Sequence, residues 1–155
     1  MIRLQFVLGG GLSSAAIAWF SSGHFSHVDA VLPSGDLLGA RSDQIGLIPP
    51  GVQQRPPMYE RWRERVVMKF TTDPAKERKF YDFLHDQLGK PYDKTAILGF
   101  VAGRDWRSAD AWFCSELQAA ALEIAEITPL LYCPTNKVTP ATLAAIGSAI
   151  GGVIG

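Results

Sequence analysis

The chain has 155 residues, of which 47% are hydrophobic and 19% charged, and this composition is typical of one globular domain. Fifteen basic residues balance fifteen acidic ones. No positive surplus is therefore present to neutralise nucleic-acid phosphates or to hold the chain on an anionic membrane. We expect a single domain over residues 1–155 that does not bind nucleic acid.

The N-terminus is apolar but is not expected to be a signal peptide. Gln5 and the glycines at 9–11 interrupt the apolar run. No stretch of the chain reaches the ~18 apolar residues that a membrane-spanning helix needs. We therefore expect no transmembrane segment, and synthesis in the cytoplasm.

The first half of the chain is predicted to form mainly strands. These predicted strands are residues 2–8, 26–32, 37–42 and 65–70. Residues 12–20 are predicted to form a short helix, and the Pro-Ser-Gly-Asp turn at 33–36 joins two of the strands into a β-hairpin. Residues 48–57 contain four prolines, which favour an extended surface loop.

The second half is predicted to be helical. The predicted helices are residues 72–88, 92–101 and 111–127, and a last one that begins at residue 139. Thr72 or Asp73 can cap the first of them, and Pro74 suits its first turn. From about residue 146 the chain becomes a Gly/Ala-rich tail that could pack on a partner. Strands followed by helices predict an α+β fold with an antiparallel sheet.

Cys114 is the first candidate for chemistry. It lies near the predicted start of the helix over 111–127, where Asp110 is the nearest good cap. The free N–H groups of a helix N-terminus favour a thiolate, and they can also hold the oxyanion of a tetrahedral intermediate. Cys133 lies in a Pro-bounded loop and is interpreted as a small apolar residue. We do not expect a disulfide between the two cysteines.

A cysteine nucleophile needs a base, and an imidazole is the usual one. The chain has three histidines. His85 lies inside an amphipathic helix, where it is expected to face solvent. His24 and His27 flank the start of the predicted hairpin, and a histidine held on a strand can face the helix that carries Cys114.

Three strings carry a resemblance to a known family: SHVDAVLPSGDLLGARS, GKPYDKTAILGF and WFCSELQAAALE. Together they resemble the permuted papain-like hydrolases, relatives of the NlpC peptidases in which the histidine strand precedes the cysteine helix. The resemblance covers about residues 2–143. It implies a circularly permuted papain-like (NlpC-like) fold, with His27 as base and Cys114 as nucleophile, and it gives no comparable role to His24 or Cys133.

The resemblance also implies a third, polar residue that orients the imidazole from the neighbouring strand. The return strand LLGARS offers no Glu or Asn. With a two-residue turn His27 would face Ser42, and a one-residue slip would bring Asp43 opposite instead. Asp29 shares the face of His27 because it lies two residues further along the same strand. We place Asp29 first, with Ser42 and Asp43 as alternatives.

Other residues are weaker candidates. Tyr92, in GKPYD, could line the oxyanion site, as a tyrosine does in the family that the chain resembles, or it could simply pack a helix start. Trp106 is interpreted as a loop anchor. No CxxC or HxxxH spacing is present, and the glycines at 9–11 lack the lysine of a phosphate loop. We expect neither a metal nor another cofactor.

The sequence therefore predicts a cysteine hydrolase that cleaves an amide bond. The resemblance implies cell-wall peptide as the leading substrate, and with it a peptidoglycan peptidase or amidase, with a phage tail as one setting for it. One alternative is a lipid amidase, thioesterase or acyltransferase of the same fold. Another is a structural tail-tip module that binds other proteins of an assembly, which complete burial of Cys114 would favour.

Overall fold

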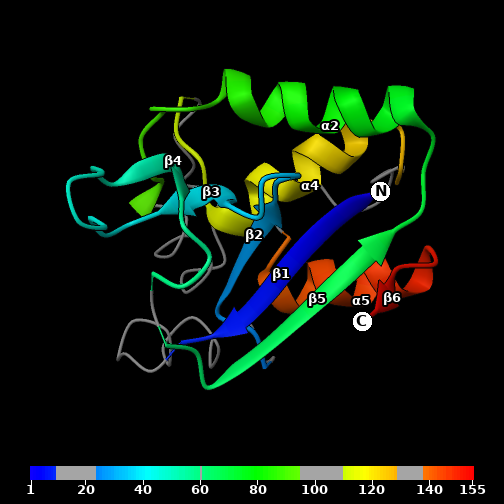
Figure 1. Ribbon diagram of the computed structural model, residues 1–155, viewed down its shortest axis with the longest axis horizontal. Coiled ribbons are helices and arrows are strands. Elements are labelled where there is room, and N and C mark those ends of the chain that lie inside the picture. The colour runs from blue at the N-terminus through cyan, green and yellow to red at the C-terminus, as the bar shows by residue number, and fades with distance from the viewer. Residues whose placement is uncertain (10–23, 60, 95–109, 129–137) are drawn as a thin grey trace.

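The computed structural model describes residues 1–9, 24–59, 61–94, 110–128 and 138–155 of the 155-residue chain. Figure 1 shows these parts as a sheet with helices packed against it. The strands are β1 (Ile2–Leu8), β2 (His27–Val31), β3 (Leu37–Arg41), β4 (Gly51–Arg55), β5 (Glu64–Phe70) and β6 (Val153–Ile154). The helices are α2 (Pro74–Asp86), α4 (Cys114–Ile124) and α5 (Pro140–Ala149).

The six strands form one sheet in the order β4-β3-β2-β1-β5-β6, and every neighbouring pair is antiparallel. β1 lies at the centre because its alternating apolar residues are buried, with Ile2, Leu4 and Phe6 fully inaccessible. Its two ladders, with β2 and β5, are the longest in the sheet together with that of β3 and β4. The predicted strand at residues 2–8 is confirmed.

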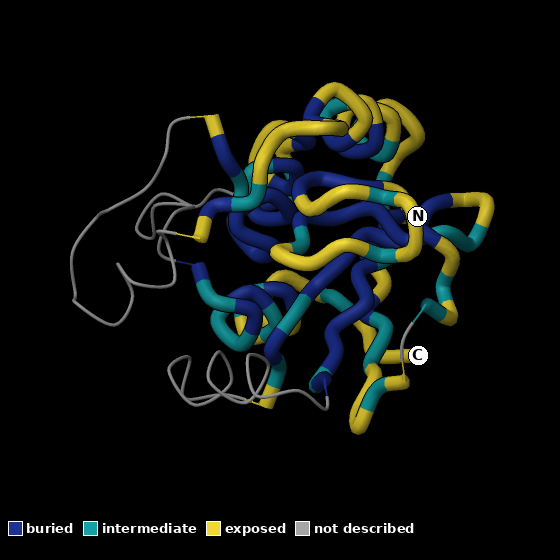
Figure 2. Tube along the Cα trace, turned by 90° about the vertical axis from the view of Figure 1, so that its left-hand side faces the viewer, coloured by how far each residue is buried: buried dark blue, intermediate teal, exposed yellow. Residues whose placement is uncertain are grey.

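The hydrophobic core lies between one face of the sheet and the helices. Apolar residues of β1 and β2, such as Phe6 and Val28, join Leu117 of α4 in a single buried cluster. α2 packs beside α4, and α5 lies behind β5 (Figure 1). In Figure 2 the outer turns of α2 are exposed, whereas the strands behind them are mostly buried.

The other face of the same strands buries polar side chains among apolar ones. Gln5 on β1 lies directly opposite Asp29 on β2, and both side chains are inaccessible to solvent. His27 and Asp29 share this face because they are two residues apart on one strand. Since burying polar groups is unfavourable unless they are paired, this face is where we look for a functional site.

Two segments differ from the sequence predictions. The Pro-rich stretch 48–57 is not a loop throughout, because β4 lies inside it and pairs with β3. The pattern is hard to recognise because β4 buries Gln53 and Arg55 rather than apolar side chains. The predicted helix at 12–20 lies outside the described residues, and so do residues 95–101 of the helix predicted at 92–101. Tyr92, at the predicted start of that second helix, instead forms a β-bridge with Trp112.

The predicted helix at 72–88 is confirmed as α2, capped by the side chain of Asp73, which accepts the N–H of Lys76 at 2.9 Å. The predicted last helix is confirmed as α5, and Thr139 caps it. The tail does not end in a loose segment. After α5 it forms β6, and Gly155 N–H donates to Val67 O of β5 at 3.1 Å.

Small residues in this tail allow close packing against β5. A Cβ atom at Gly147 would lie 2.5 Å from the Met68 sulfur, and one at Gly152 would lie 2.7 Å from it. Both distances are too short for a methyl group beside a sulfur. The Gly-rich composition is therefore explained by the fit of α5 and β6 over Met68.

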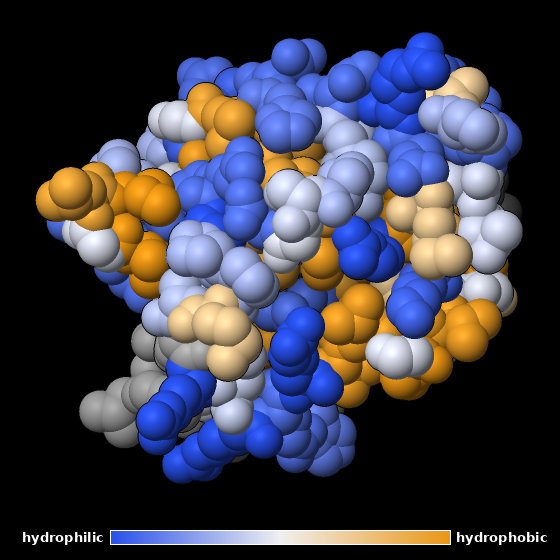
Figure 3. Space-filling view, viewed as in Figure 1, coloured by the Kyte–Doolittle hydropathy of each residue, from blue (hydrophilic) through white to orange (hydrophobic). Residues whose placement is uncertain are grey.

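Apolar side chains also gather at the end of the β3–β4 connection, which projects on the left of Figure 1. Figure 3 shows this projection in the colour of hydrophobic residues. Leu47 is 97% exposed there, in a tight turn closed by backbone hydrogen bonds between Ile45 and Ile48. Of the helices in the described parts of the chain, none is long and apolar enough to cross a membrane.

Candidate functional site

Helix α4 places Cys114 at its first residue. We predicted a start at Ala111 capped by Asp110, and this is wrong: the cap position is Phe113. The helix starts later because Trp112 is extended and pairs in a parallel β-bridge with Tyr92. The later start moves Cys114 closer to the free N–H groups of the helix N-terminus.

The Cys114 thiol reaches the sheet where β2 and β3 separate. The N–H of Leu32 donates across the hairpin to Asp36 O. Alternate N–H groups of a strand point to the same neighbouring strand, so the Val28 N–H, four residues earlier, is also directed toward β3. The ladder between the two strands ends at Ala30, before Val28 could pair. The Val28 N–H faces the thiol instead, which places the sulfur beside the residue that follows His27.

Burial dominates the ionisation of this thiol. It raises the pKa of Cys114 to about 12, although the N–H groups of Val28 and Ser115 and the charge of Arg41 act in the opposite direction. The negative charge of Asp29 adds to the rise. The helix N-terminus does act on Cys114 as predicted, but its effect is smaller than that of desolvation. The resting thiol is therefore neutral at physiological pH.

His27 and Asp29 form a buried pair on β2. The His27 Nε2 atom lies 2.9 Å from Asp29 Oδ1, and the two side chains are 12% and 1% exposed. Desolvation lowers the pKa of His27, Asp29 opposes this, and the charges of Arg55 and Arg41 lower the pKa further. The imidazole is therefore neutral at physiological pH, as a proton acceptor must be.

Asp29 is held as a carboxylate by Arg55. Burial acts to raise the pKa of Asp29, but the Arg55 guanidinium, followed by His27, outweighs it and holds the pKa well below its ordinary value. Arg55 Nη2 donates to Oδ1, the same oxygen that faces His27. Among the described atoms, Asp29 Oδ2 is buried without a hydrogen-bond partner.

These contacts select one tautomer of His27. Its Nε2 atom lies 2.9 Å from Asp29 Oδ1 and 3.1 Å from Arg55 Nη2. A guanidinium only donates hydrogen bonds and an ionised carboxylate only accepts them. A bare Nε2 could accept from Arg55 but would turn its lone pair toward the carboxylate, whereas a protonated Nε2 donates to Asp29 at the shorter distance. We therefore assign the proton to Nε2. The lone pair is then on Nδ1, which is the nitrogen able to accept a proton.

The structure brings Asp29, rather than Ser42 or Asp43, to His27. Asp43 instead makes a two-point ion pair with Arg41, with Nε–Oδ1 and Nη2–Oδ2 distances of 2.6 and 2.8 Å. Ser42 is exposed. The catalytic role of Asp29 stays a prediction.

The predicted register of the hairpin is wrong by one residue. The turn has three residues between Leu32 and Asp36 rather than two, and Gly35 has the positive φ of 95° that such a turn requires. Because Ala30 pairs with Leu38, the extended register would bring Arg41, not Ser42, opposite His27.

Two arginines and Tyr59 lie beside this pair. The Tyr59 ring contacts both Arg41 and Arg55, whose guanidinium carbons are 5.0 and 4.9 Å from its centroid. Arg41 Nη1 donates to the Tyr59 hydroxyl oxygen at 2.6 Å, and burial is the main cause that raises the pKa of Tyr59 to about 12.

Tyr92 lies near the thiol. Burial raises its pKa well above the ordinary value, and the nearby Cys114 adds to the rise. Its ring packs on Phe113, the residue before Cys114, with centroids 5.9 Å apart. The placement is compatible with the predicted role at the oxyanion site. His24 and His85 are exposed, and Trp106 and Cys133 lie outside the described residues.

Gly39 makes room for the Asp29 carboxylate. A Cβ atom at Gly39 would overlap Asp29 Oδ1 and lie 3.2 Å from its Cγ. We expect Gly39→Ala to push the carboxylate away from His27 and to lower the free energy of unfolding by about 1–3 kcal/mol, the usual cost of overpacking. Urea unfolding measures the loss. An unchanged midpoint would show that the carboxylate has space to move.

Sequence reasoning missed Arg55, Arg41 and Tyr59. Arg55 lies in a segment whose four prolines predicted a surface loop, and nothing local distinguishes a buried arginine from an exposed one. Arg41 lies next to the end of the predicted return strand, and only the correct register would have placed it opposite His27. Nothing in the sequence around Tyr59, apart from its being aromatic, indicated that it would lie near the site.

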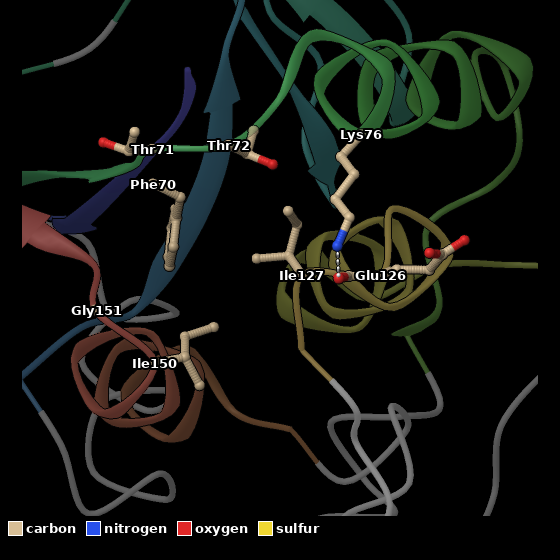
Figure 4. Close-up of a pocket in the computed structure, with 8 residues that line it drawn as sticks. All are labelled: Phe70, Thr71, Thr72, Lys76, Glu126, Ile127, Ile150 and Gly151. Carbon is tan, nitrogen blue, oxygen red and sulfur yellow. Dashed lines mark hydrogen bonds between the residues drawn. The ribbon is translucent and has the colours of Figure 1, made fainter.

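A pocket of about 200 Å³ lies away from these residues, between the ends of α2, α4 and α5 (Figure 4). Phe70, Ile127 and Ile150 supply apolar atoms, and Lys76 reaches across to donate to Glu126 O at 2.8 Å. Glu126 follows the C-terminal end of α4, whereas Cys114 starts this helix. Eleven residues of helix, about 16 Å, therefore separate this pocket from the thiol.

No protein-family model and no curated protein matches the chain. Its fold is similar to the crystal structure of the metalloprotein yiiX from Escherichia coli O157:H7, DUF1105, with a TM-score of 0.56 and 19% sequence identity. The match covers 79% of this chain but 64% of that protein, so the chain spans less than two thirds of it. At this identity the likeness concerns the fold alone.

This comparison corrects the predicted fold family. We expected a circularly permuted papain-like (NlpC-like) fold, and this is wrong: the chain has a mostly antiparallel six-stranded sheet with three described helices, similar to a DUF1105 protein. The strings that carried the resemblance cover one β-hairpin, the segment around Tyr92 and one helix start. Such local features occur in many α+β proteins and do not determine how the strands are ordered.

Proposed function

We propose that this chain is a thiol-dependent hydrolase with Cys114 as nucleophile, His27 as base and Asp29 as the residue that orients the base. One observation carries the proposal: a buried carboxylate bonds His27 Nε2 at 2.9 Å, on the strand that packs against α4, the helix that begins with Cys114. Buried ionisable groups are costly to a fold and are typical of active sites. The proposal concerns the reaction type and does not rest on a family.

The proposed reaction starts from a neutral thiol and a neutral imidazole. As the sulfur attacks the substrate carbonyl carbon, the thiol proton moves to His27 Nδ1. Asp29 stays ionised and stabilises the imidazolium through Nε2–H. The imidazolium then protonates the leaving group as its bond to carbon breaks. Water attacks the resulting thioester, His27 takes a proton from it, and the acid and the free thiol are released.

A metal mechanism is not supported by the residues present. The similar protein is described as a metalloprotein. Among the described residues of this chain, however, no group of three His, Cys, Asp or Glu side chains could hold a metal ion. The most promising pair, His27 and Asp29, has the guanidinium of Arg55 on the same carboxylate oxygen. A cation there would be repelled, so we derive no step through a metal.

One observation favours a purely structural role instead. Cys114 is 0% exposed, and a substrate must reach it. A buried cysteine is often only a small apolar residue. The test of the proposal must therefore separate an accessible, reactive Cys114 from an inert one.

Acetylation by p-nitrophenyl acetate is the test, because the probe is small and forms a thioester only with a nucleophilic thiol. We expect intact mass spectrometry to show one acetyl group, which peptide mapping places on Cys114 and hydroxylamine removes. The modification should be lost in Cys114→Ala and retained in the matched control Cys133→Ala. A folded protein in which Cys114 stays unmodified and no Cys114-dependent p-nitrophenolate is released would support the structural role and refute the hydrolase.

A further inference from the structure

Arg55 is a fully buried cation on a short strand. Its side chain is 0% exposed, and Nη1 donates to the carbonyl oxygens of Gly39 and Gln53, both at 3.2 Å. Nη2 donates to Asp29 Oδ1 and lies 3.1 Å from His27 Nε2. Two backbone carbonyls and an aromatic ring therefore fix the guanidinium at the point where the carboxylate and the imidazole meet.

A buried carboxylate requires a nearby positive charge. Two groups contact Asp29 Oδ1 and can supply one: Arg55 and a protonated His27. If His27 were the counter-ion, it would be an imidazolium with no lone pair, and it could not accept a thiol proton. Because Arg55 already carries a permanent charge, His27 can stay neutral.

We propose that Arg55 is a positioning residue that serves as the counter-ion of Asp29 and thereby leaves His27 neutral, with Nε2–H on Asp29 and Nδ1 open. The role of Arg55 as the counter-ion of Asp29 rests on the distances given above. Its importance for proton transfer from Cys114 rests on the proposed hydrolase function.

Several charged groups face His27 and bear on its protonation. They are Asp29 on β2, Arg41 on β3, Asp43 in the connection after it, and Arg55 on β4. Asp43 is already paired with Arg41 by two hydrogen bonds. From β1, the residues next to His27 and Asp29 in register are Val7 and Gln5, which carry no charge, and α4 brings the neutral thiol.

The experiment is an NMR titration of the histidine side chains in the 15N-labelled full chain. Three histidines are present, and His27→Gln identifies the signal of His27. In the wild type we expect a midpoint below the ordinary 6.5 and a single Nε2–H tautomer above it. Arg55→Gln should raise the midpoint by about 1–3 pH units, because Asp29 then holds a proton on His27. Arg55→Lys should keep it low.

Asp29→Asn provides an independent arm that does not depend on removing Arg55. With Arg55 in place and the anion removed, we expect the His27 midpoint to fall below that of the wild type. A purely structural role would move the midpoint in the same direction in Asp29→Asn and Arg55→Gln, and that result would overturn the proposal. An unchanged midpoint in both Arg55 variants would overturn it too. If Arg55→Gln does not fold, three measurements still test the proposal: the tautomer of His27 in the wild type, and its titration midpoints in Arg55→Lys and in Asp29→Asn.

The acetylation test and the titration fail separately. If Cys114 is not acetylated while the midpoints move as expected, the hydrolase is refuted and the role of Arg55 as counter-ion stands. If Cys114 is acetylated while the midpoints do not move, the hydrolase stands and Arg55 has another role.

Discussion

Arg55→Met is expected to lower the free energy of unfolding at pH 7 by about 3–5 kcal/mol, because the buried Asp29 carboxylate loses its permanent cation and is left with only the titratable His27 beside it. Methionine keeps the apolar stem but also loses the hydrogen bonds to the Gly39 and Gln53 carbonyls and the contact with the Tyr59 ring, so the loss is not due to charge alone. The measurement is urea unfolding followed by the fluorescence of the four tryptophans. Arg65→Met is the matched control: Arg65 is exposed on β5, and its loss should change stability by less than about 0.5 kcal/mol.

A double variant tests the cause of this loss. Arg55→Met combined with Asp29→Asn contains neither charge, and asparagine still fits over Gly39. We expect the double variant to be more stable than Arg55→Met alone, because the uncompensated charge is gone. If the two losses simply add, the pair is not coupled. A loss below about 1 kcal/mol in Arg55→Met would show that water reaches the carboxylate.

The same pair makes stability depend on acid pH. The pKa of Asp29 in the folded chain lies well below its ordinary value, which is about 3.9 in unfolded chains. A group with a depressed pKa contributes stability above its unfolded pKa and loses that contribution as pH falls toward the folded one. We therefore expect the wild type to lose stability below about pH 4 more steeply than Asp29→Asn. Parallel curves for the two proteins would contradict this.

The sequence was sufficient to predict the residues that share a local element. His27 and Asp29 are two apart on a strand of period 2, so their shared face follows from the strand alone. Cys114 at a helix start follows from the apolar periodicity of the segment that it opens. The register of the hairpin did not follow, because a three-residue turn and a two-residue turn fit the same Pro-Ser-Gly sequence.

What could not be predicted depends on segments that meet only in the folded chain. The helix N-terminus predicted a lowered thiol pKa, and burial by the surrounding sheet and helices reversed the sign. Arg55 needed the knowledge that residues 51–55 form a strand beside β3. Its burial is stabilised by a carboxylate that lies 26 residues earlier in the chain. Local patterns contain no information about such a pairing.

The opposite signs of the two pKa shifts predict how the reaction depends on His27. With a thiol pKa of about 12, only about one molecule in 10⁵ carries a thiolate at pH 7, so attack needs a base. We expect His27→Ala to slow acetylation of Cys114 by about 10²–10⁴-fold at pH 7. His85→Ala, which alters an exposed residue on α2, is the matched control and should react like the wild type.

The pH dependence of the acetylation rate shows whether His27→Ala removes a base or instead disturbs the structure around Cys114. Wild-type acetylation should rise with pH only up to the His27 pKa, below 6.5, and then stay level, because the neutral imidazole takes the proton at any higher pH. Without the base, the rate follows the thiolate itself, so in His27→Ala it should rise about tenfold per pH unit toward pH 12. A His27→Ala rate that is low and independent of pH would instead mean that the substitution blocks access to Cys114. A wild-type rate that climbs tenfold per unit would remove His27 from the mechanism.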